Sequence, residues 1–116
     1  MKLNEVYEIA NEIAPKKLSD EACAAFGWYD NSGVLIDVGE EVKGILFSLD
    51  LSFQAIEKAV ESGCNLILTH HPAMYGKLNH ARVDGDDLTE RKLVKAIQNG
   101  ISVLSMHLNL DYVKGG

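Results

Sequence analysis

Residues 44–72, GILFSLDLSFQAIEKAVESGCNLILTHHP, decide the fold because they contain a strand, a helix and a second strand in succession. The apolar runs at 44–49 and 65–69 are short and nearly continuous, as expected of strands covered on both faces of a sheet. Between them, Ser52 can cap a helix that ends at Ser62-Gly63. Strands joined through a helix pair in parallel, so this stretch predicts a βαβ unit.

The same pattern continues toward the C-terminus. Residues 75–86 are polar and rich in turn formers, which predicts a loop. Asp87 and Glu90 have the spacing of a capping box at the start of a second helix, which Asn99-Gly100 ends. The apolar run 101–106 predicts a third strand. Two successive βαβ units predict an α/β fold with a mostly parallel or mixed sheet and helices on its faces.

The N-terminal third is less regular. An apolar stripe from Leu3 to Ala14 predicts a first helix, which Pro15 ends. We interpret residues 16–30 as a loop with at most a short helix at 20–25, and residues 34–36 as a short strand after a turn. At 116 residues, the chain is expected to form a single domain, residues 1–116.

Composition narrows the classes of function. The net charge is −6, with 17 acidic and 11 basic residues, so a broad nucleic-acid surface or an anionic-membrane surface is not expected. No apolar run approaches the ~18–20 residues that span a bilayer, and the first residues are polar, unlike a secretory signal. Two isolated cysteines do not make a disulfide framework. A cytoplasmic protein with reduced thiols is therefore expected.

The strongest chemical signal is the histidine pair His70-His71 at the end of the second apolar strand. Imidazoles are good ligands for transition metals, and Pro72 stops the strand directly behind them. Side chains of adjacent strand residues point to opposite faces. The two rings therefore either leave strand geometry to share one ion, or serve two ions bridged by a carboxylate.

The parallel sheet supplies partners for this pair, because the carboxyl ends of parallel strands meet at one edge. Asp50 and the segment 107–111 follow the other two strands of the predicted units. Asp111 is the best candidate for the carboxylate. His107 is a candidate ligand or hydrogen-bond partner, and Asp50 is a candidate for a metal-supporting role or for an ordinary helix cap.

His80, by contrast, lies in the polar loop and is expected to be solvated.

Several segments together resemble one family. They are Trp28-Tyr29-Asp30-Asn31-Ser32-Gly33, Ser48-Leu49-Asp50, residues 63–72 and His107-Leu108-Asn109-Leu110-Asp111. In order and spacing, the chain resembles the N-terminal portion of the NIF-three-like family, the GTP cyclohydrolase I type 2 homologues. The resemblance implies an α/β fold with a dinuclear metal centre in ring-like homo-oligomers. It also implies that His70, His71 and Asp111 are metal ligands, with Asp50 and His107 as supporting residues.

The chain departs from that family in its length and in two motifs. Family members are generally about twice as long or longer, and their remaining ligands come from a His-x-x-x-Glu element in the C-terminal half. Leu51-Ser52 and Met106-His107-Leu108 also differ from the usual motifs. We therefore expect a half-protein whose incomplete centre binds metal more weakly. The exposed sheet edge of such a half-protein favours homo-oligomers.

Three functions follow as expectations. The first is a metal-dependent hydrolase, in which the ion activates water and polarises a substrate such as a nucleotide. The second is a non-catalytic metal-binding or protein-interaction module. The third is a truncated domain without activity of its own. Histidine and carboxylate ligands suit Zn, Mn, Fe, Ni and Co alike, so the identity of the divalent ion stays open.

Overall fold

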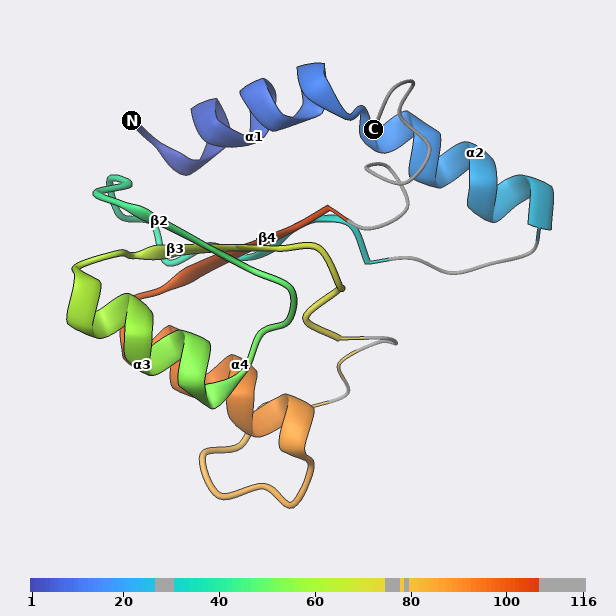
Figure 1. Cartoon of the computed structure of the whole chain (residues 1–116). Coiled ribbons are helices and arrows are strands. Elements are labelled where there is room, and N and C mark those ends of the chain that lie inside the picture. Colours follow the sequence, from blue (N-terminus) through green and yellow to red (C-terminus); the bar gives the residue numbers. More distant parts are fainter. Residues whose placement is uncertain (27–30, 75–77, 79, 107–116) are drawn as a thin grey trace.

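The computed structural model describes residues 1–26, 31–74, 78 and 80–106. Its centre is a four-stranded sheet with the order β1-β4-β3-β2 (Figure 1). The strands are β1 (Gly33–Ile36), β2 (Ile45–Ser48), β3 (Leu66–Thr69) and β4 (Ser102–Ser105). β2, β3 and β4 run parallel, whereas β1 pairs with β4 in the antiparallel direction. The predicted α/β fold with a mostly parallel or mixed sheet is confirmed.

The two predicted βαβ units are present. Helix α3 (Phe53–Ser62) joins β2 to β3, and helix α4 (Leu88–Gln98) joins β3 to β4. In the register of the sheet, Ser48 lies opposite Thr69, and Thr69 lies opposite Ser105. The three parallel strands therefore end level with one another, and the residues that follow them share one edge.

The caps of α3 and α4 explain where these helices begin. Ser52 Oγ accepts a hydrogen bond from Ala55 N at 3.0 Å. At α4, Asp87 Oδ1 accepts from Thr89 N at 2.8 Å and from Glu90 N at 3.2 Å. The Asp87 cap is as predicted, but the Glu90 carboxylate turns away from the cap toward Arg82 and is buried.

Helices cover both faces of the sheet (Figure 1). α3 and α4 pack on one face, and α1 (Leu3–Ile13) packs on the other. The core of the first layer contains Ile36, Leu51, Ala55, Ile56, Ala59, Ile67, Leu93, Ala96, Ile101 and Val103. The core of the second layer contains Leu3, Val6, Ala10, Ala14, Leu66, Leu104 and Met106. Alternate residues of β3 and β4 thus point into different layers, as a strand buried on both faces requires.

The prediction of a loop after Pro15 was wrong, because residues Lys16–Phe26 form a helix, α2, of 11 residues. Only Ser19 and Ala22 of this helix are buried. A helix that buries so few residues needs no regular apolar stripe, so its sequence shows little apolar periodicity. Local ion pairs support it instead: Lys16 Nζ lies 2.7 Å from Asp20 Oδ1, and Lys17 Nζ lies 3.7 Å from Glu21 Oε1. The i,i+4 spacing of opposite charges indicates this helix, whereas the apolar residues do not.

In the part of the chain that the structure describes, every helix is too short or too polar to cross a bilayer.

Candidate metal centre

The histidine pair follows β3 without a gap and is held against the chain beyond β2. His70 N donates to Ser48 O at 3.2 Å, and His71 N donates to Leu49 O at 2.9 Å. Two consecutive N–H groups thus donate to the same neighbouring segment, whereas those of a regular parallel strand alternate between its two neighbours. These bonds fix the backbone of both histidines at the carboxyl edge of the sheet.

The imidazole of His70 is oriented by the neighbouring strand. Its Nδ1 lies 2.9 Å from the carbonyl oxygen of Met106, directly after β4. A carbonyl oxygen can only accept, so this contact requires the hydrogen to be on Nδ1. In the neutral ring the lone pair then lies on Nε2, which is the nitrogen through which such a histidine ligates a metal.

The imidazole of His71 is oriented by Asp50. Its Nδ1 lies 2.7 Å from Asp50 Oδ1, and the two side chains are 35% and 58% exposed, respectively. An ionised carboxylate accepts hydrogen bonds only, so the hydrogen again lies on Nδ1. Asp50, two residues past the end of β2, was predicted to support the pair. The structure places it in contact with His71.

The two rings lie side by side at the rim. Their centroids are 5.4 Å apart, and their planes are inclined by 37°. The pair has therefore left strand geometry, in which the rings would point to opposite faces. Thr69 contributes to this turn, because its hydroxyl donates to His71 O at 2.7 Å. The two imidazoles are therefore neighbours at this edge of the sheet.

The other predicted site residues, His107 and Asp111, lie outside the described residues. Within residues 1–26, 31–74, 78 and 80–106, no cluster of three or more His, Cys, Asp or Glu side chains could hold an ion. The described part of the site is thus a pair of imidazoles with fixed tautomers. This donor set fits part of a metal centre.

His80 is not simply solvated, as the sequence had indicated. Its ring is half exposed, but Nδ1 lies 3.0 Å from Oε2 of the buried Glu90. Helix α4 thus carries a partner for His80 that the loop sequence alone does not reveal.

Sequence reasoning also missed three hydroxyl residues, Ser48, Thr69 and Ser105, which end the three parallel strands. A signal was available, because each stands two positions before a candidate site residue: Asp50, His71 and His107, respectively.

Fold and site together define the class of protein: a mixed-sheet α/β protein with paired histidines at the carboxyl edge of its parallel strands. The chain belongs to the DUF34/NIF3 (NGG1p interacting factor 3) family, whose family model matches residues 1–116. The predicted resemblance to the NIF-three-like family is confirmed.

Two clostridial proteins illustrate the relationship. The chain is 38% identical over 117 residues to the "GTP cyclohydrolase 1 type 2 homolog" of Clostridium perfringens. It is 34% identical over 117 residues to the protein of that name from Clostridium acetobutylicum. The alignments cover 100% of this chain, but only 41% and 40% of the two relatives. The chain thus spans about two fifths of the length of the curated relatives that it matches.

Solved structures show the same fold. Reduced HcgD from Methanocaldococcus jannaschii superposes with a TM-score of 0.79 at 30% identity, covering 100% of this chain and 43% of that one. A Bacillus cereus protein related to NIF3 gives a TM-score of 0.80 at 27% identity, covering 97% of this chain and 29% of that one. In both cases the similarity extends over nearly all of this chain.

Proposed function

We propose that this chain carries part of a divalent-metal centre, in which His70 and His71 ligate through Nε2 and Asp50 orients His71. One observation carries the proposal: both Nδ1 atoms face acceptors, at 2.9 Å from Met106 O and at 2.7 Å from Asp50 Oδ1. Metal-ligating histidines commonly donate their second ring N–H to a carbonyl or carboxylate, which fixes the ring and raises its basicity.

The motif adds Asp111 as the proposed carboxylate ligand and His107 as a supporting residue. Two imidazoles and a carboxylate resemble the three protein ligands of catalytic zinc sites, where water takes the remaining position. Zn, Mn, Fe, Ni and Co all suit such ligands. When bound, the ion would lower the pKa of a coordinated water toward ~7 and polarise a phosphate, amide or purine-ring substrate.

We propose a metal-dependent hydrolase as the function, with a nucleotide such as GTP as the substrate. The names of the clostridial relatives support this choice, although the chain spans only two fifths of their length. The alternative is a non-catalytic metal-binding or interaction module. Turnover of GTP and generic phosphoesters by the metal-loaded chain, with loss in Asp111→Ala, supports the hydrolase. Stoichiometric metal binding without turnover of any substrate favours the module.

Replacing Asp50 tests the site directly. Asp50→Asn keeps the shape of the side chain but removes the charge that orients His71. The dissociation constant for Co²⁺ is expected to rise about 10–100-fold. Competition with a chromophoric chelator, followed through the visible spectrum of bound Co²⁺, measures this change.

The matched control for this experiment is Asp37→Asn. Asp37 is another exposed carboxylate, and its Oδ1 accepts from Gly39 N at 2.8 Å, outside the histidine pair. Its replacement should leave the Co²⁺ affinity unchanged. Equal affinity of wild type and Asp50→Asn would contradict the role proposed for Asp50.

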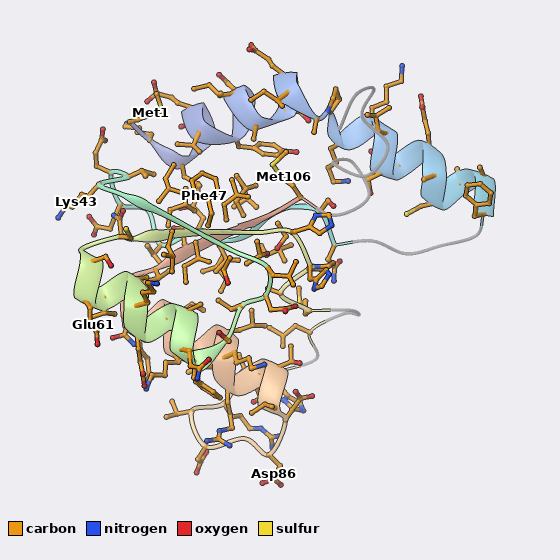
Figure 2. The ribbon with its side chains drawn as sticks, in the orientation of Figure 1. Met1, Lys43, Phe47, Glu61, Asp86 and Met106 are labelled. Atoms are coloured by element: carbon orange, nitrogen blue, oxygen red, sulfur yellow. The ribbon has the colours of Figure 1, made fainter. Side chains whose placement is uncertain are left out.

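We also propose that the chain forms homo-oligomers through the β2 edge of the sheet. Phe47 and Leu49 are 72% and 58% exposed. Figure 2 places Phe47 on the α1 side of the sheet, and β2 is an edge strand of the sheet that the described residues form. An exposed apolar edge strand can pair with another chain. A second copy of the chain fits it, because a two-fold contact needs only this one surface.

Phe47→Glu is therefore expected to convert the self-associated chain into a monomer, because the charge would be buried in the contact. Light scattering after size-exclusion chromatography, at tens of micromolar chain, measures the mass. Val60→Glu is the control, since Val60 is also exposed, at 52%, but lies on helix α3. A monomeric wild type, or an unchanged mass for Phe47→Glu, would rule out this interface.

A further inference from the structure

Each parallel strand ends in a hydroxyl residue on the same face of the sheet. Ser48, Thr69 and Ser105 are the last residues of β2, β3 and β4, and they are in register across the three strands. Thr69 and Ser105 are fully buried. We call these three residues the hydroxyl row.

Two members of the hydroxyl row make the same local hydrogen bond. The Ser48 hydroxyl donates to Asp50 O at 2.7 Å, and the Thr69 hydroxyl donates to His71 O at 2.7 Å. In both cases the side chain binds the carbonyl two residues further on. The two residues held in this way, Asp50 and His71, are the ones whose side chains meet at 2.7 Å.

The third member completes the row. Thr69 Oγ1 lies 2.7 Å from Ser105 Oγ, and the single Thr69 hydrogen already goes to His71 O. Ser105 must therefore donate to Thr69. A buried chain of hydroxyls thus runs from β4 through Thr69 to the backbone of His71. Ser105 stands two positions before His107, which lies outside the described residues.

We propose that the hydroxyl row is a positioning device for the metal centre: Ser48 and Thr69 set the backbone of Asp50 and His71, and Ser105 fixes Thr69. The proposal rests on the function proposed above. A bond from a hydroxyl to the carbonyl of a turn holds that turn in one conformation. Buried hydroxyls must be hydrogen-bonded in any case. A loss of stability alone therefore does not test the positioning role. The test is whether a substitution in the hydroxyl row also changes metal binding and the orientation of His71.

Thr69→Val removes the hydroxyl at nearly constant volume. We expect the dissociation constant for Co²⁺ to rise about 10-fold or more, as for other residues that orient metal ligands. We expect Thr69→Ser, which restores the hydroxyl, to restore the affinity. Thermal unfolding of the metal-free variants, measured in parallel, reports the effect of each substitution on stability.

Ser102→Ala is the matched control. Ser102 is a buried serine at the other end of β4, and its hydroxyl oxygen accepts from Val38 N at 3.1 Å. Its removal should lower stability without changing the Co²⁺ affinity. Wild-type affinity in Thr69→Val overturns the proposal, and so does an equal loss of affinity in Ser102→Ala. If Thr69→Val does not fold, Ser48→Ala replaces it as the test variant, and its dissociation constant for Co²⁺ is likewise expected to rise.

A measurement on the metal-free protein separates this proposal from the proposed function. Long-range ¹H–¹⁵N NMR of the imidazoles at pH 8.5 should show His71 as the Nδ1–H tautomer in wild type and in Ser102→Ala. Thr69→Val should show a mixture of tautomers, because the Asp50 contact loosens. If wild type binds no Co²⁺, the metal centre fails, but this comparison still decides the positioning role. Identical spectra for wild type and Thr69→Val overturn it.

Discussion

Replacing both His70 and His71 by alanine is expected to abolish stoichiometric metal binding. Removal of both imidazoles leaves Asp111 as the remaining proposed ligand, and a single carboxylate does not hold a transition metal in competition with water. Elemental analysis of protein purified without chelator measures the metal content per chain. Wild type should carry bound metal, and the double variant should carry only a trace.

Two comparisons make this experiment specific. His80→Ala removes a histidine that contacts Glu90 on helix α4, and it should keep the wild-type metal content. The His70 and His71 side chains are only partly buried and lie outside both core clusters. The double variant should therefore stay folded, and its far-UV circular dichroism should match that of wild type. Equal metal content in wild type and the double variant would remove the basis for the metal centre.

The fold could be predicted largely because its central part is built from local signals. The strands at 45–48, 66–69 and 102–105 fall within the predicted apolar runs, and Ser52 and Asp87 cap the helices that follow. The direction of β1 could not be predicted. Its partner β4 is distant in sequence, and the pairing shifts register between Val34 and Ile36. Such non-local pairing leaves no pattern within β1 itself.

The candidate site was predictable in its position but not in its details. The carboxyl-edge rule brought Asp50 close to the histidine pair, and the structure places Asp50 against His71. Whether the two rings lie together could not be derived from strand periodicity. The answer depends on Thr69, whose hydroxyl bonds to His71 O. It also depends on a Met106 carbonyl, which no side-chain pattern reveals.

Replacing Glu90 is expected to have the second large effect, a loss of thermal stability, because the Glu90 carboxylate binds the loop before α4. Only 1% of the residue is exposed. Oε1 accepts from Arg82 N and lies 3.3 Å from Arg82 Nε, while Oε2 lies 3.0 Å from His80 Nδ1. The loop closes so tightly on this group that a Cβ at Gly85 would lie 2.7 Å from Oε1. The loop is thus built around an ionised carboxylate.

The contacts of Glu90 give its contribution a definite pH dependence. Burial alone would raise the pKa of Glu90, but the hydrogen bond from Arg82 N and the contacts with His80 and the Arg82 side chain together lower that pKa from its ordinary value. A carboxyl with a lowered pKa in the folded state stabilises the fold above its unfolded pKa. That contribution is lost as the pH falls through the folded pKa.

Glu90→Gln, which cannot ionise, is therefore expected to melt on the order of 5 °C below wild type at neutral pH. The gap should narrow as the pH falls through the lowered pKa of Glu90 in the folded state, where the wild-type carboxyl becomes protonated. Circular dichroism melts between pH 3 and pH 7 measure both curves. Glu57→Gln, at an exposed glutamate on α3, is the control and should melt with wild type throughout. A Glu90→Gln curve that stays parallel to wild type would show that the ionised carboxylate does not hold the loop.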